Sequence, residues 1–173
     1  MASVMRYRGG VVQYQAFPTA NDGVVTKSIE VGDLVYVDSD TAYPASYQTD
    51  QGTAAQNRAY FAARFAGVAV QKIGLQSGET TFKLTNDPGW ILVATTGDFE
   101  FDCASTSFTP GDMVGVYNDG TDNDDQKVAQ VTVETEAIGV VKVPYSVLGS
   151  SMTKVIVSIR SRVMLNQVVI SGQ

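Results

Sequence analysis

The chain has 173 residues and a net charge of −6, with 12 Lys and Arg against 18 Asp and Glu. Its hydrophobic fraction of 44% and charged fraction of 17% indicate a folded domain and argue against a disordered chain. The acidic balance argues against nucleic-acid binding, which needs clustered basic residues. With no His and one Cys, the chain lacks the residues for His-dependent catalysis, Cys-based zinc sites and intrachain disulfides.

The two ends of the chain are expected to be extended arms, over residues 1–10 and 166–173, outside a single β domain spanning residues 11–165. The N-terminal residues carry charges without a following apolar stretch, so we expect no secretory signal and no membrane span. We therefore expect the protein to be made in the cytosol. In the tail, Val168-Val-Ile170 is expected to add a strand to a neighbour's sheet or to pair with its own.

Short segments rich in β-branched and aromatic residues dominate the chain and predict strands. Turn signals such as Asn118-Asp-Gly120 separate them. Regular short strands with such turns predict a mainly β fold, either a compact β-barrel or a β-sandwich. The predicted strands cover residues 10–15, 34–38, 67–73, 81–84, 91–95, 98–103, 113–117, 127–136, 139–144 and 155–165.

One alanine-rich segment, residues 53–65, predicts the single short helix. Tyr60, Phe61 and Phe65 are spaced to share a helical face. Asp50 and Thr53 are the candidate capping residues. We expect this helix to pack over one end of the sheet, and the Ser- and Thr-rich connection at residues 146–153 to be a loop.

The chain also repeats a pattern of turn and strand. Val31-Gly-Asp-Leu-Val-Tyr-Val37 resembles Pro110-Gly-Asp-Met-Val-Gly-Val116, and each is followed by a similar strand, at residues 65–70 and 137–143. The Gly-Asp pair favours a turn, because glycine accepts positive φ and aspartate bonds nearby backbone amides. The repeat predicts two related β-units within one domain, with chance similarity of short motifs as the alternative.

The charges are segregated along the chain. Residues 98–136 hold ten acids and one base, Lys127, whereas residues 137–173 hold four bases and no acid. The simpler interpretation is two faces of one domain. The alternative is docking of an acidic edge of one copy onto a basic edge of the next in a ring.

Three groups of residues were weighed as chemical sites. The acidic loop at residues 118–125 has oxygen ligands suited to calcium, but EF-hand spacing would require its turn glycine at Lys127, so a solvated hairpin loop is favoured. The carboxylate pairs Glu100 with Asp102 and Glu134 with Glu136 are interpreted as the polar outer face of strands. Ser150-Ser151 lacks an activating His. We therefore expect no enzyme, no catalytic residue, no cofactor and no metal.

Aromatic residues in or beside predicted loops, together with two arginines near the N-terminus, remain as candidates for an interface with a partner or a second subunit. Aromatic residues in or beside loops often anchor protein interfaces. Their alternative role is to close the open ends of a small barrel. The candidates are Arg6, Tyr7, Arg8, Tyr43, Tyr47, Tyr60 and Trp90.

The order of several motifs resembles the capsid decoration, or cement, proteins of tailed bacteriophages over residues 31–163. The resemblance implies a compact β-barrel-like domain bound to the outer capsid surface of the virion. The implied partner is the major capsid protein, and the implied state is a homo-oligomer, preferably a trimer at local three-fold axes, that braces the mature head. The motifs are Gly32-Asp-Leu-Val35, Ala66-Gly-Val-Ala-Val70, Ser77-Gly-Glu79, Val93-Ala-Thr-Thr-Gly-Asp-Phe-Glu-Phe101, Pro110-Gly-Asp-Met-Val114, Ile138-Gly-Val-Val141 and Val155-Ile-Val-Ser-Ile-Arg160.

The chain is longer than the simpler members of that family, and it adds the helical segment at residues 53–65 and extra residues at both ends. Two other functions stay open. One is a different structural component of a phage head or tail. The other is a carbohydrate- or ligand-binding β-module that uses Trp90 and the tyrosines as a stacking platform.

Overall fold

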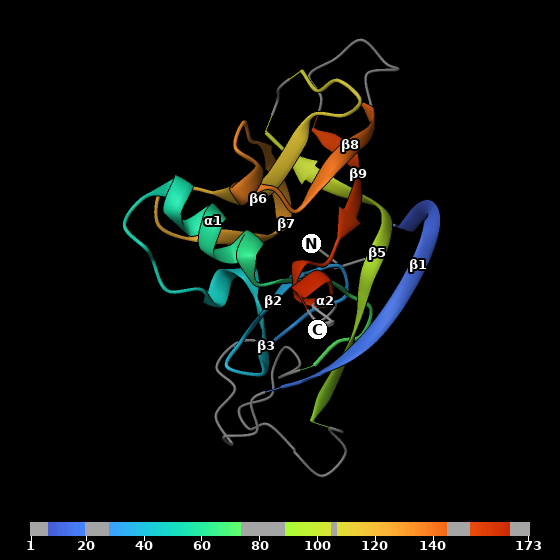
Figure 1. The fold of residues 1–173 in the computed structure, drawn as a ribbon, viewed down its shortest axis with the longest axis vertical. Coiled ribbons are helices and arrows are strands. Elements are labelled where there is room, and N and C mark those ends of the chain that lie inside the picture. Colours follow the sequence, from blue (N-terminus) through green and yellow to red (C-terminus); the bar gives the residue numbers. More distant parts are fainter. Residues whose placement is uncertain (1–6, 20–27, 74–88, 105–106, 145–152, 167–173) are drawn as a thin grey trace, which may run out of the picture.

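The computed structural model describes residues 7–19, 28–73, 89–104, 107–144 and 153–166. It confirms a mainly β fold in which the described strands join one sheet that closes into a barrel (Figure 1). The elements are β1 Tyr7–Pro18, β2 Leu34–Asp38, β3 Thr41–Pro44, η1 Ala45–Tyr47, α1 Ala54–Ala63, β4 Phe65–Ala69, β5 Trp90–Cys103, β6 Met113–Asn118, β7 Asn123–Gln130, η3 Glu134–Glu136, β8 Gly139–Pro144, β9 Lys154–Arg160 and α2 Arg162–Asn166.

The barrel is a ring of strands in the order β5, β7, β6, β8 and β9, and β9 pairs back onto β5. β5 meets β9 antiparallel over Thr96–Asp102 and meets β7 in parallel at its last two residues. The side chains that point into the barrel are mostly branched or aromatic, and their burial stabilises the closed ring. Fully buried examples are Phe99, Val114, Val116, Val128, Val155 and Val157.

A second ring of strands uses the first half of β5. There β5 pairs with β1 on one edge and with β4 on the other, and β4 continues to β2 and β3. A single bridge between Thr19 and Ala42 joins the end of β1 to β3. This ring surrounds its own apolar cluster, which contains Phe17, Val35, Ala42, Ala69, Ile91 and Val93. β5 is therefore a wall of both rings.

The two predicted β-units are confirmed by equivalent turns. In the first, Asp33 Oδ2 accepts a hydrogen bond from Glu30 N (2.7 Å); in the second, Asp112 Oδ2 accepts one from Thr109 N (2.8 Å). The strands that follow the two turns also pair in equivalent ways: β2 is antiparallel to β4, and β6 is antiparallel to β8. The short matching motifs thus encode matching structure.

Each unit also has a glycine where two strands pack too closely for any side chain. A Cβ on Gly67 of β4 would overlap the carbonyl oxygen of Ala94, and a Cβ on Gly139 of β8 would overlap that of Ser158. These glycines are needed because only a residue without Cβ allows this approach.

The predicted helix is confirmed as α1, which lies on the side of the molecule opposite β1 (Figure 1). Thr53 is its cap, since its hydroxyl accepts from Gln56 N (3.2 Å). Phe61 is fully buried in the barrel cluster and Tyr60 is half-buried, but Phe65 begins β4 and is not helical. Neither helix of the described ranges has the length or hydrophobicity of a membrane-spanning segment.

Several predicted boundaries were wrong. The strands predicted at residues 91–95 and 98–103 form one strand, β5, and the strand predicted to end at residue 165 ends at Arg160, where α2 follows. The strand predicted at 127–136 starts at Asn123 and ends at Gln130. β3 was missed. The arm predicted at residues 1–10 enters β1 at Tyr7. The predicted strand 81–84, most of the 146–153 loop, residues 1–6 and the tail 167–173 lie outside the described residues.

Candidate interaction surfaces

Three of the predicted interface tyrosines surround a buried fourth one, Tyr36. The Tyr36 ring lies 5.7 Å from that of Tyr43, which in turn stacks on Tyr47 at 4.8 Å and 4°. Burial, followed by the nearby Tyr60 and Asp38, raises the pKa of Tyr36. This tyrosine cluster is the best-defined aromatic feature among the candidates.

Within the cluster, only Tyr47 presents much of its ring to solvent, at 45% exposure. Tyr60 is half-buried and bonded to its own chain. Its hydroxyl donates to Asp38 Oδ2 (3.0 Å), and the Arg64 guanidinium lies 3.8 Å from its ring centre. Burial and the hydrogen bond to Asp38 raise the pKa of Tyr60. Tyr47 is therefore the member suited to contact a partner.

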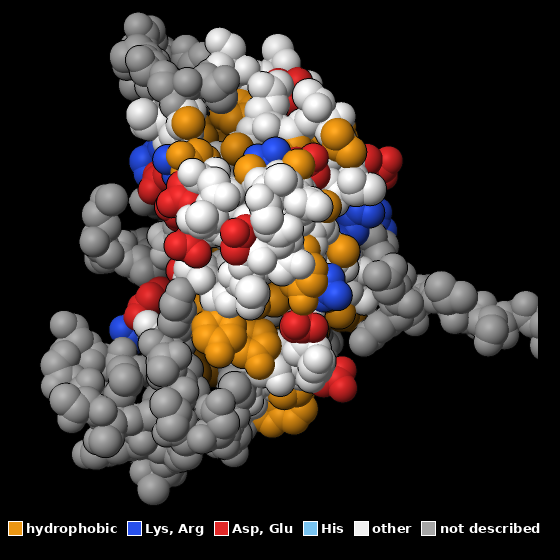
Figure 2. All heavy atoms as spheres, turned by 90° about the vertical axis from the view of Figure 1, so that its left-hand side faces the viewer, with side chains coloured by type: hydrophobic (Ala, Val, Ile, Leu, Met, Phe, Trp, Pro, Cys, Tyr) orange, Lys and Arg blue, Asp and Glu red, His pale blue; other side chains and the backbone are white. Residues whose placement is uncertain are grey.

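Figure 2 shows the face that carries α1, where hydrophobic side chains lie next to acidic ones. The β6–β7 hairpin packs against η1 and α1 on this side. Asp125 Oδ1 accepts from Ser46 N (2.6 Å), and Asn57 Nδ2 donates to the Thr121 carbonyl (3.2 Å). The tyrosine cluster and the acidic hairpin therefore belong to neighbouring parts of the surface.

Several polar groups of the hairpin loop bond within the loop, although the buried Asn123 Nδ2 has no hydrogen-bond partner among the described residues. Asp119 Oδ1 accepts from the backbone amides of Thr121 (3.1 Å) and Asp122 (3.0 Å), and these bonds lower the pKa of Asp119. Asp122 and Asp124 are exposed. In the described ranges, no three carboxylate or thiol side chains gather closely enough to hold a metal ion.

The other two aromatic candidates lie at opposite ends of the β1–β5 pair. Trp90 faces Pro18 at one end and is 51% exposed; Tyr7 faces Phe99 at the other and is 45% exposed. The Tyr7 ring lies 5.9 Å from that of Phe99, and its hydroxyl donates to Gly10 O (2.8 Å). The predicted residues thus fall into separate places, and Arg6 lies outside the described residues.

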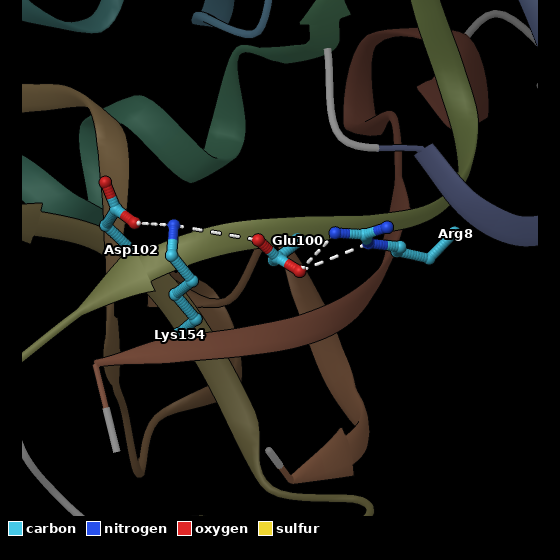
Figure 3. Close-up of polar contacts among 4 residues, drawn as sticks. All are labelled: Arg8, Glu100, Asp102 and Lys154. Carbon is cyan, nitrogen blue, oxygen red and sulfur yellow. Dashed lines mark hydrogen bonds and ion pairs between the residues drawn. The ribbon is translucent and has the colours of Figure 1, made fainter. Parts of the chain in front are cut away.

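Arg8, another candidate, is engaged with its own chain (Figure 3). Its Nε and Nη2 donate to Glu100 Oε2 at 3.1 and 2.7 Å. Lys154 Nζ lies 3.6 Å from the other Glu100 oxygen and 2.8 Å from Asp102 Oδ1. The Glu100 side chain is only 5% exposed. The interpretation of Glu100 as part of a solvated outer face was therefore wrong, because β1 and Lys154 cover it.

Several of the segregated charges pair with one another within the chain. Besides the Lys154 contacts, Lys142 Nζ lies 3.5 Å from Asp98 Oδ2, so bases of β8 and β9 neutralise acids of β5. Glu136 is also buried, against Arg58 Nε (2.5 Å). Some acids of residues 98–136 therefore pair with bases of residues 137–173 inside the chain, and docking of charged edges between copies stays a prediction.

Asp33 is a buried carboxylate that the sequence pattern marked only as a turn residue. Its Oδ1 accepts from Gln126 Nε2 of β7 (2.8 Å) while Oδ2 bonds the backbone of its own turn. Burial raises the pKa of Asp33 to about 7, although both hydrogen bonds act in the opposite direction. Asp33 therefore links the first β-unit to the hairpin of the second.

A cavity of about 290 Å³ lies between the end of β1, the turn after β2 and α2. Its walls are mainly apolar, with an acidic group among them. This size is at the lower limit for small-molecule pockets, so it fits a side chain or a small apolar group. It is lined by Gln15, Ala16, Phe17, Pro18, Val37, Asp40, Val163 and Met164.

No protein-family model, curated protein or solved structure significantly matches the chain. The functional interpretation therefore depends on the order of the sequence motifs and on the surfaces described above.

Proposed function

We propose that this protein binds the outer surface of a bacteriophage capsid, through the major capsid protein, and stabilises the mature head. The observation that carries the proposal is the ordered set of motifs over residues 31–163, which resembles cement proteins. The compact closed barrel is the fold that this resemblance implies. Such a protein acts by contact and needs no catalytic residue.

The described surface suits contact with a shell. Tyr47 and Trp90 are large, exposed aromatic side chains of the kind that anchor interfaces. The net charge of −6 disfavours binding to the packaged DNA. Retention on the shell gains from multivalency if subunits associate, so we propose a homo-oligomer, with a trimer as the expected form.

Co-sedimentation with purified heads tests the proposal. We expect saturable binding to mature, expanded heads of the matching phage, weaker binding to immature shells, and greater resistance of the decorated heads to heat. Absence of binding to either form would refute it. Trp90→Ala and Tyr47→Ala locate the contact, and Val133→Ala is the control, since Val133 is an exposed apolar residue (48%) that lies between β7 and η3.

The alternative of a carbohydrate-binding module has one supporting feature, the stacked pair of Tyr43 and exposed Tyr47. Trp90 makes no ring contact with the tyrosines among the described residues; it lies at the start of β5 opposite Pro18, and the tyrosines lie around Tyr36. A glycan array separates the two functions: a cement protein is expected to bind no sugar, whereas a module of this kind would lose its sugar binding in Tyr47→Ala.

A further inference from the structure

Within the described residues, β1 has one edge without a partner strand. In the described part of the chain, β5 is the only strand that pairs with Tyr7–Pro18, and β3 is reached only beyond it, through Thr19. Figure 1 shows β1 along the outside of the molecule. An exposed edge presents a row of N–H and C=O groups that are ready to pair with another chain.

The hydrogen bonds show which residues of β1 face this edge. Gln13 N donates to Thr96 Oγ1 (3.1 Å) and the Val11 carbonyl accepts from the same hydroxyl (2.8 Å), so both direct their backbone groups toward β5. Alternate residues of a strand direct these groups to opposite edges. Val12 and Tyr14 therefore direct their N–H and C=O groups to the open edge.

This edge also lacks charged side chains over residues 9–18, and charges are one of the usual protections against pairing. Residues 9–18 read Gly-Gly-Val-Val-Gln-Tyr-Gln-Ala-Phe-Pro and contain no charged side chain. Val11 is 80% exposed and Tyr14 is 54% exposed. Natural proteins commonly place charges, especially Lys, on such edges to prevent association. In a chain of net charge −6, an uncharged edge lets two copies approach without local repulsion.

We propose that the open edge of β1 pairs antiparallel with the same edge of a second copy, across a two-fold axis. With Gln13 on the axis, Val12 of one copy lies opposite Tyr14 of the other, and the two Gln13 side chains face each other. This register uses the outward backbone groups and stays clear of the Thr19 bridge. A two-fold contact uses the same surface on both copies. It is therefore compatible with the proposed trimer and would join two trimers.

Sedimentation velocity over a range of protein concentrations tests the pairing. We expect the wild-type particle mass to double as concentration rises. Gln13→Lys places like charges directly opposite each other, and we expect it to weaken the association of the two copies about five- to tenfold. Gln13→Glu is expected to have the same effect. An equimolar mixture of the two variants is expected to recover the association, because the facing charges are then opposite. Only self-pairing at residue 13 predicts that recovery.

Val133→Lys and Val133→Glu are the matched controls, because Val133 is also exposed (48%) but lies between β7 and η3, and both are expected to associate like the wild type. The proposal is overturned if the wild-type mass never doubles, if folded Gln13→Lys doubles over the same concentrations as the wild type, or if the mixture fails to recover. It does not depend on capsid binding, so a protein that pairs but ignores phage heads would refute only the proposed function.

Discussion

The contact between Arg8 and Glu100 fastens the start of β1 to β5, and its strength follows from its exposure. The Arg8 side chain is 49% exposed and that of Glu100 is 5% exposed. Exposed ion pairs contribute about 0–1 kcal/mol, and removing one partner of a buried pair costs about 3–5 kcal/mol. This half-solvated pair lies between those limits. Lys154, 3.6 Å away, also partly compensates the carboxylate. We expect a coupling energy of about 1–2 kcal/mol.

The assay is a double-mutant cycle by urea denaturation with Arg8→Ala, Glu100→Gln and the double variant. Arg8→Ala alone is expected to lower Tm by roughly 3–8 °C. The control cycle uses Lys142 and Asp98, which lie 3.5 Å apart with Lys142 57% exposed, and should give less than about 0.5 kcal/mol. The reasoning is wrong if the Arg8–Glu100 coupling does not exceed that of the control pair.

Three further predictions concern the core and one buried acid. The folded-state pKa of Asp33, about 7, exceeds its unfolded value of about 3.9, so its stabilisation is complete below pH 4 and lost as pH rises to 7. The unfolding free energy should fall by up to about 1.4 kcal/mol per pH unit across that window; Asp33→Asn should abolish this slope in denaturation curves, and Asp112→Asn should keep it. Phe61→Ala should cost about 3–5 kcal/mol in the same assay. Gly67→Ala should prevent folding, which circular dichroism would show as loss of the β-sheet signal. Gly111→Ala, with no atom within 4 Å of its new Cβ, should lower the unfolding free energy by only about 1–2 kcal/mol.

The elements predicted best from sequence are those whose pattern is local. β2 matches its predicted range because its apolar run follows a Gly-Asp turn, and α1 was marked by alanines and a Thr53 cap. β3 was missed because it is only four residues long and follows a turn at Ser39 and Asp40. Both residues have positive φ, 48° and 66°, where Gly or Asn is usual, so the hairpin signal was absent.

The candidate sites were predicted less completely, because burial of polar groups depends on distant parts of the chain. Nothing near Glu100 in sequence indicates that Arg8, 92 positions away, covers it. Asp33 likewise meets Gln126 across 93 positions. The tyrosines were named as candidates because aromatic residues near loops are a local signal, and their interface role stays a prediction. Their packing around Tyr36 depends on contacts between strands and was not predicted.

Because β5 is a wall of both rings, the two rings of the described chain share one strand. The first β-unit supplies the strand that the second needs to close its barrel, so we expect the two apolar clusters to melt together in one cooperative transition. For a protein proposed to hold a pressurised shell together, this continuity has a mechanical meaning. A pull on the strands of one ring is passed to the other along a single uninterrupted backbone, and no flexible joint between two domains lies in its path.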